Sequence, residues 1–117
     1  LRKMKINLLV IRSNNLKEIA EQYAALGLQL TYHQHGNGPF HYSCTLDDFV
    51  FEIYPASANY PADRSIRLGF SIPASAYKTS SIESVWKIIH PISKTEWGDQ
   101  LVLEDLDGRK VVLTISD

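Results

Sequence analysis

The chain has 117 residues, 44% of them hydrophobic and 21% charged, with a formal net charge of −1. These values suit one compact domain, and the near-neutral charge gives no reason to expect nucleic acid or an anionic membrane surface as a partner. No apolar run approaches the ~20 residues of a membrane-spanning helix. The apolar part of LRKMKINLLVI is short and lacks a small-residue cleavage site, which argues against a secretory signal.

Cysteine usage points to a reducing compartment. The single cysteine, Cys44, excludes an internal disulfide and a cysteine-based zinc cluster. We therefore expect a cytoplasmic protein. Cys44 lies within the strand-like sequence FHYSCTL, where a thiol more often fills a small buried space than acts as a nucleophile.

The first half of the chain predicts a strand, a helix and three further strands. The helix is the clearest element, because Leu16, Ile19, Ala20, Tyr23 and Leu26 recur at helical spacing with charges between them. The expected elements are a strand at 4–11, a helix at 16–27, and strands at 28–35, 40–46 and 49–54.

The second half repeats this order. Residues 55–65, PASANYPADRS, are rich in proline, alanine and serine and are typical of a linker. After it we expect a strand at 65–73, a helix within 75–89, a weak strand at 91–97, and strands at 99–105 and 109–116. The sequence thus predicts one domain over 1–117, with βαβββ units at 4–54 and 66–117.

The order of these elements, together with several short sequences, resembles the vicinal oxygen chelate superfamily of glyoxalases, bleomycin-resistance proteins and dioxygenases. The sequences are INLLVIRS, YAALGL, FEIYP, RLGFSIP and LEDLDGRKVVL. In that superfamily each βαβββ unit curls into a half-open cup, and two units pair. The resemblance therefore implies an α+β fold whose two curved mixed sheets enclose a cavity.

The resemblance also bears on metal binding. Metal-dependent members place ligands on the first and fourth strands of each unit, and Glu52 matches the glutamate on the fourth strand of the first unit. The remaining positions correspond to Leu8, Arg67 and Val112. Leucine and valine have no donor atoms, and arginine stays cationic, so we expect the superfamily's metal site to be lost and no cofactor to be bound.

Glu52 lies in the apolar strand FVFEIYP, where alternation predicts that Val50, Glu52 and Tyr54 face the cavity. The cup geometry implied by the resemblance brings Arg67 close to Glu52, with a guanidinium in place of the metal. Either the two form an ion pair that presents hydrogen-bonding groups to a ligand, or both point to solvent.

The histidines allow two interpretations. His33 and His35 share one strand face, and His41 lies on the next strand, so the three could bind zinc or copper if they converge. The residues between them, 36–39, form a turn tip, where solvent-exposed histidines are ordinary, and we favour this second interpretation. His90 is expected to end a helix in a structural role.

Aromatic residues complete the predicted ligand site. Tyr42, Tyr54 and Trp97 are candidates for a cavity wall, because flat rings with polar groups suit planar or cationic molecules. Tyr60 in the linker could cover the cavity mouth or touch a partner chain. The predicted ligand-binding residues are Glu52, Arg67, Tyr54, Tyr42, Trp97 and His41.

Three functions are compatible with the sequence. The first, which we favour, is a non-enzymatic protein that binds a small aromatic or cationic molecule, as in the bleomycin-resistance branch, whose homodimers hold ligand between chains. The second is a metal-dependent lyase, isomerase or dioxygenase that uses Glu52 and nearby histidines. The third is a structural or regulatory partner whose cup is filled by its own side chains. A homodimer is expected.

Overall fold

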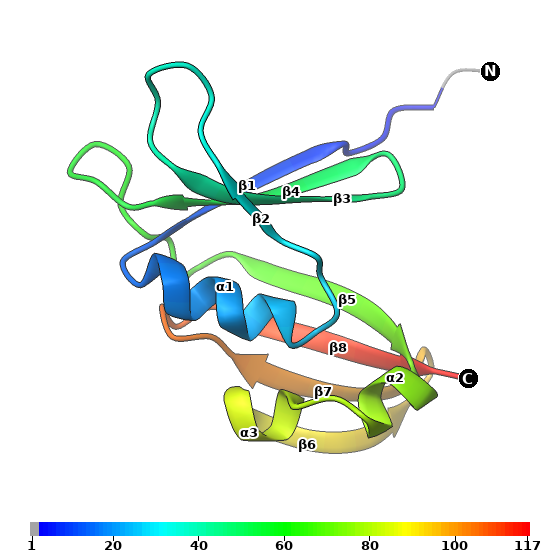
Figure 1. The fold of residues 1–117 in the computed structure, drawn as a ribbon. Coiled ribbons are helices and arrows are strands. Elements are labelled where there is room, and N and C mark those ends of the chain that lie inside the picture. The colour runs from blue at the N-terminus through cyan, green and yellow to red at the C-terminus, as the bar shows by residue number, and fades with distance from the viewer. Residues whose placement is uncertain (1–2) are drawn as a thin grey trace.

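The computed structural model describes residues 3–117, which form two four-stranded sheets with helix α1 between them (Figure 1). The first sheet has the strand order β1-β4-β3-β2, in which β1 and β4 are parallel and the other pairs antiparallel. Its unit comprises β1 (Leu8–Ser13), α1 (Leu16–Ala24), β2 (Thr31–His33), β3 (His41–Leu46) and β4 (Phe49–Pro55).

The second sheet repeats this topology with the order β5-β8-β7-β6, again with one parallel pair, β5 and β8. Its unit comprises β5 (Arg67–Pro73), α2 (Ala74–Lys78), α3 (Ile82–Val85), β6 (Lys87–Thr95), β7 (Gly98–Glu104) and β8 (Lys110–Ser116). The fold is therefore the expected α+β arrangement of two βαβββ units. The two sheets do not close around a cavity within one chain.

The helical part of the second unit differs from expectation. Instead of one helix within 75–89, two short helices occur, and β6 begins at Lys87. Ser80 lies between them, where its hydroxyl donates to the Tyr77 carbonyl (2.7 Å) and accepts from the Ile82 amide (3.3 Å). Such side-chain bonds compete with the helical backbone. His90 consequently lies exposed on β6, not at a helix end.

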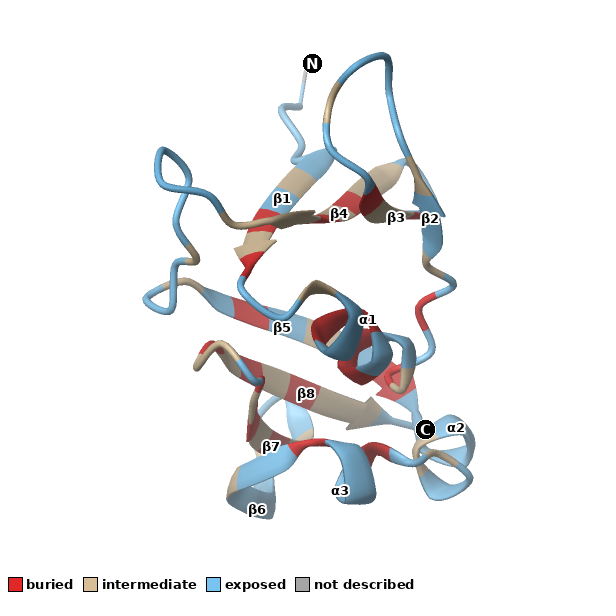
Figure 2. Cartoon of the chain, turned by 60° about the vertical axis from the view of Figure 1, so that its left-hand side comes forward, coloured by how far each residue is buried: buried red, intermediate tan, exposed pale blue. Residues whose placement is uncertain are grey.

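One hydrophobic core serves both units. Phe51 and Ile53 of β4 are buried in the same cluster as Leu103 and Val111 of the second sheet. Figure 2 shows buried segments on both sheets and on α1 between them. The ring of Tyr23 on α1 lies at the centre, within 6.2 Å of the rings of three residues, Phe51, Phe70 and Trp86. Within residues 3–117, no helix has the length and apolar character needed to cross a bilayer.

A buried polar turn, Asp105–Arg109, joins the second unit to the first. The Arg109 guanidinium is fully buried and donates to Asp105 Oδ2 at 2.7 Å, and the Tyr23 hydroxyl donates to the same oxygen at 2.7 Å. Arg109 also donates to the backbone carbonyl of Arg12 on β1. Gly108 has φ +94°, a left-handed conformation that favours glycine. The turn has the sequence DLDGR, and its buried acidic and basic side chains pair with one another inside the fold.

Candidate functional site

The first sheet has one covered face and one open face. Along β4, Phe51 and Ile53 are buried against α1, whereas Val50, Glu52 and Tyr54 are partly exposed on the opposite side. We call the side that carries these three residues the outer face. The alternation is the one expected from the sequence.

Strand pairing adds further residues to the outer face. On β1, the neighbours of Glu52 and Tyr54 are Val10 and Arg12, and on β3, Ser43 lies opposite Glu52. His33 of β2 pairs directly with His41 of β3 on the same side. Polar and charged groups therefore gather over β2, β3, β4 and the end of β1 at Arg12, whereas Leu8 and Val10 make the start of β1 apolar.

Four side chains of the outer face form a continuous stack. The Arg12 guanidinium lies between two phenol rings, 4.6 Å from the centroid of Tyr60 and 4.8 Å from that of Tyr54. On its other face the Tyr54 ring lies flat on the His41 imidazole, with centroids 4.0 Å apart and planes 9° apart. A cation over an aromatic face is attracted by the ring quadrupole. The linker thereby contributes a ring to the site through Tyr60.

At the end of this stack, three imidazoles and a carboxylate converge. We call His33, His35, His41 and Glu52 the histidine–glutamate cluster; one nitrogen or carboxylate oxygen of each lies within 4.8 Å of the others. The three rings have centroids 4.5–5.1 Å apart. The expectation of solvent-exposed histidines holds for His35 alone, since His33 is half-buried and His41 is only 1% exposed.

Hydrogen bonding orients His41 within the cluster. Its Nδ1 lies 3.1 Å from the Pro39 carbonyl, and its Nε2 lies 3.5 Å from Glu52 Oε2. The Nε2 atoms of His33 and His41 are buried without a hydrogen-bond partner among the described residues. Buried polar atoms rarely lack a partner, so this pair of nitrogens needs an explanation.

The six predicted ligand-binding residues do not all meet. Glu52, Tyr54 and His41 lie together on the outer face, as described above. Arg67 is exposed on β5 in the second sheet, and no ion pair joins it to Glu52 within residues 3–117. The physical reason is that both sheets pack against the shared core, so Glu52 and Arg67 point away from that core on different sheets.

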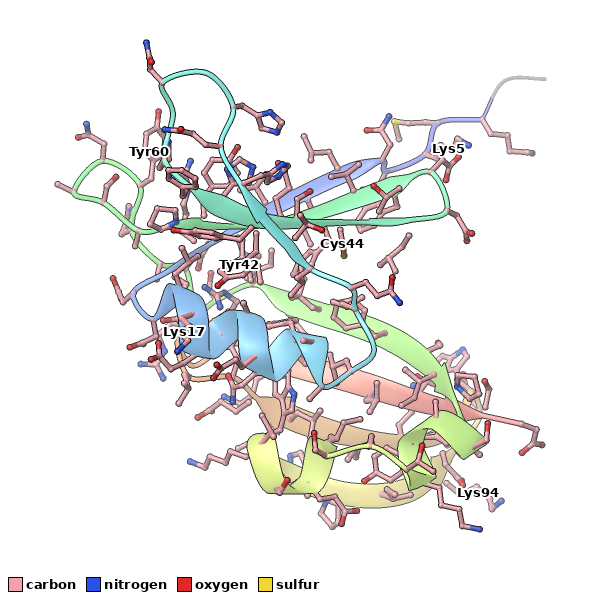
Figure 3. The ribbon with its side chains drawn as sticks, viewed as in Figure 1. Lys5, Lys17, Tyr42, Cys44, Tyr60 and Lys94 are labelled. Carbon is pink, nitrogen blue, oxygen red and sulfur yellow. The ribbon has the colours of Figure 1, made fainter. Side chains whose placement is uncertain are left out.

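Tyr42 and Trp97 also lie elsewhere. Tyr42 pairs with Ile53 on β4, so its side chain is on the face that looks toward α1 (Figure 3). There its ring lies 4.8 Å from that of Tyr32. Trp97 is 71% exposed in the turn between β6 and β7. Neither residue contributes to the outer face of the first sheet.

Sequence reasoning missed Arg12. The signal was present, because Arg12 has the same parity on β1 as Leu8 and Val10, and β1 is parallel to β4. An arginine at the end of an otherwise apolar strand, one residue before the loop to α1, would be a candidate from this register alone. What the sequence did not reveal is that Tyr60, five residues beyond β4, folds back over it.

No known protein-family profile and no curated protein matches the sequence. Among solved structures, the antibiotic-binding protein TnmS3 from Streptomyces sp. CB03234 is similar over 100% of this chain and 99% of its own, with a TM-score of 0.73 and 16% identity. The oxidase ChaP-H2 is similar over 99% of this chain and 96% of its own, with a TM-score of 0.74 and 12% identity. A glyoxalase-related enzyme from Fulvimarina pelagi is similar over 97% of this chain and 89% of its own, with a TM-score of 0.71 and 12% identity.

The chain therefore has the glyoxalase-like fold of these proteins, with two βαβββ units. At identities of 12–16% these similarities show the fold and not the function. The four positions at which the resemblance implies metal ligands, Leu8, Glu52, Arg67 and Val112, lie on β1, β4, β5 and β8 of this structure.

The residues at those positions do not fit a metal ion. Leu8 is 53% exposed on the outer face of β1, and Val112 lies on β8, where its neighbour on β5 is Gly69. Neither side chain has a donor atom, and the Arg67 guanidinium repels a cation. Of the superfamily's four positions, Glu52 alone offers a ligand atom.

Proposed function

We propose that the protein binds a small planar molecule on the outer face of the first sheet. The observation that carries this proposal is the stack of Tyr60, Arg12, Tyr54 and His41, with rings and guanidinium spaced 4.0–4.8 Å apart. The parallel rings of Tyr54 and His41 favour another flat group, and the Glu52 carboxylate beside them favours a ligand with a positive charge or an N–H donor.

Two features support binding in preference to catalysis. Three of the four superfamily metal positions carry side chains that do not coordinate a metal ion, as described above. In addition, TnmS3, which is similar over the full length of this chain, is described as an antibiotic-binding protein. Both features favour a protein that binds its ligand without catalysing a reaction.

The proposal includes a homodimer. The outer face is open in a single chain, and its apolar rim at β1 exposes Leu8 by 53% and Val10 by 37%. A sheet from a second copy that covered this face would turn it into a cleft, the arrangement that the resemblance to bleomycin-resistance proteins implies. Light scattering coupled to size-exclusion chromatography tests this directly, and a mass of 13.3 kDa, that of one chain, would contradict it.

The ligand proposal is tested by screening planar compounds, neutral and cationic, by thermal shift in metal-free buffer, followed by calorimetric titration of those that stabilise the protein. We expect the affinity of such a compound to fall at least tenfold in Tyr54→Leu and in Glu52→Gln. Trp97→Ala is the matched control, because Trp97 is an exposed aromatic residue away from the outer face. A ligand whose affinity depends on Trp97 and not on Tyr54 would overturn the proposed site.

A metal-dependent lyase, isomerase or dioxygenase is the second candidate. The convergence of His33, His35, His41 and Glu52 favours it, because a divalent ion held there could polarise a carbonyl group of a bound substrate. Metal-dependent conversion of a small carbonyl compound, absent in His35→Gln, would establish this candidate.

A further inference from the structure

The histidine–glutamate cluster is drawn from separate segments of the first unit. His33 ends β2, His35 lies in the turn that follows, His41 begins β3 and Glu52 is central in β4. The turn is fixed by a hydrogen bond from the Gly38 amide to the His35 carbonyl at 3.0 Å, and by one from the Gln34 side chain to the Gly38 carbonyl at 2.7 Å. These bonds fold His35 back over the sheet, so its position follows from the hairpin.

We propose that His33, His35, His41 and Glu52 form a binding site for a divalent transition-metal ion, with zinc as its first occupant. The site shares Glu52 with the superfamily's usual metal position and takes its other ligands from β2, β3 and their turn. It goes beyond the proposed ligand-binding function and does not depend on it.

The first observation behind this assignment is a pair of buried imidazole nitrogens without hydrogen bonds among the described residues. Nε2 of His33 and Nε2 of His41 are both buried, and neither has a hydrogen-bond partner within residues 3–117. When Nδ1 of His41 donates its proton to the Pro39 carbonyl, Nε2 carries a lone pair that faces the Glu52 carboxylate at 3.5 Å. Two acceptors at this distance repel one another unless a cation lies between or beside them.

The second observation is that His41 has the outer support typical of a metal ligand. Metal-binding histidines almost always donate their other ring N–H to a carbonyl or carboxylate, which fixes the tautomer and the ring orientation. The Pro39 carbonyl provides this acceptor for His41. The Tyr54 ring, stacked 4.0 Å from the imidazole, restricts its rotation further.

The spacing of the cluster suits a tetrahedral ion. With bonds of ~2.0–2.1 Å to nitrogen and oxygen, neighbouring ligand atoms of a tetrahedral zinc site lie ~3.4 Å apart. The contact between His41 Nε2 and Glu52 Oε2 already has nearly this length, 3.5 Å, and the whole cluster spans no more than 4.8 Å. The longest separation exceeds this spacing by ~1.4 Å, which requires side-chain rotations, and the exposed His35 has the most room to make one.

The donor set selects the class of ion. Three imidazoles and one carboxylate suit zinc, copper, nickel and iron, whereas calcium and magnesium prefer oxygen ligands. Zinc comes first because it accepts four nitrogen and oxygen ligands in tetrahedral geometry without further requirements. A direct contact between the His41 ring and Glu52, with no ion, is the competing explanation of their 3.5 Å separation, and it predicts no metal binding.

The test is a calorimetric titration of the full chain with zinc chloride alone, on protein made without a polyhistidine tag and freed of metal by a chelator. We expect one equivalent of zinc per chain, and cobalt at the same site should give the visible absorption bands of a tetrahedral complex. His35→Gln and Glu52→Gln should each weaken zinc binding at least tenfold. Because His41 is buried, the exposed His35 provides the decisive variant.

His90→Gln is the matched control, because His90 is the remaining histidine of the chain and lies exposed on β6 in the second sheet. Zinc affinity should be unchanged in this variant. The proposal is overturned if zinc shows no saturable binding, if His35→Gln and Glu52→Gln bind zinc as the unaltered protein does, or if His90→Gln weakens binding as much as they do. None of these outcomes bears on the binding of a planar molecule, which is measured in metal-free buffer.

Discussion

The Tyr54 ring and the His41 imidazole lie parallel, with centroids 4.0 Å apart, and both belong to the outer face of the first sheet. Their contact joins two parts of the candidate site. Tyr54 also contacts the cation of Arg12, and the Nε2 atom of His41 lies 3.5 Å from the carboxylate of Glu52. A change in either ring is therefore expected to affect both the stack and the cluster.

Removing the Tyr54 ring should destabilise the protein modestly. Tyr54→Ala loses the stacking on His41 and the contact with Arg12, and we expect the free energy of unfolding to fall by about 1–2 kcal/mol. Tyr54→Phe keeps the ring and should stay close to the unaltered protein. Urea denaturation followed by circular dichroism measures the free energy of unfolding of both variants. An equal loss of stability in the two variants would show that the Tyr54 ring does not stabilise the fold.

Neutralising Asp105 should be far more costly. Asp105→Asn leaves the fully buried guanidinium of Arg109 without its closest carboxylate, and breaking a buried pair from one side costs about 3 kcal/mol or more. Asp48→Asn is the control, because Asp48 and Lys5 form an exposed pair, with both side chains 67% exposed, worth at most about 1 kcal/mol. Chemical denaturation of both variants under one set of conditions gives the comparison.

Stability should decline in alkaline solution because of Tyr23. Burial, followed by the charge of Asp105, raises the pKa of the Tyr23 hydroxyl well above its ordinary value. The folded state therefore holds this proton more tightly than the unfolded chain does, so the contribution to stability is fully present below pH ~10 and is lost as the pH rises above it.

The measurement is urea unfolding between neutral pH and pH ~11, the range that crosses the ordinary tyrosine pKa. Tyr23→Phe should have a lower stability at neutral pH, because the bond to Asp105 is lost, and a flatter decline above pH ~10. The same slope in both proteins would assign the alkaline decline to other groups.

Cys44 should react slowly with thiol reagents in the folded protein. It is buried on β3, and desolvation raises the pKa of its thiol, so the reactive thiolate is scarce at neutral pH. We expect modification by a disulfide reagent at pH ~8 to be at least tenfold slower than in urea-unfolded chain. Equal rates in folded and unfolded protein would contradict the buried position.

Much of the fold follows from local patterns in the sequence. The alternation in FVFEIYP fixes which residues of β4 face α1, and the repeated order of elements gives two βαβββ units. The prediction of one helix within 75–89 was wrong. Apolar spacing indicates which face of a helix is buried, but it does not reveal that a serine hydroxyl interrupts the helical backbone. The side of the sheet on which Tyr42 lies could have been read, since a two-residue turn pairs Leu46 with Phe49 and so Tyr42 with Ile53.

The candidate site was less accessible, because it depends on contacts that no periodicity encodes. The sequence placed Glu52 and Tyr54 on one face, and it raised the convergence of His33, His35 and His41 as an alternative. That alternative requires the turn at residues 36–39 to bring His35 over the sheet, which follows from hydrogen bonds within the turn. The expected pair of Glu52 and Arg67 depended on how two units pack, and a shared core separates them.

The bond from Arg109 to the backbone of Arg12 has a mechanical consequence. Arg12 accepts this bond at its backbone carbonyl, and its guanidinium contacts the rings of Tyr54 and Tyr60. A fragment that ended in the linker would lack Arg109 and would lose the bond that holds the Arg12 backbone in place. Cleavage of the peptide chain between 56 and 65 should leave the bond from Arg109 to Arg12 intact, because this bond lies in the protein interior and does not depend on the connecting loop.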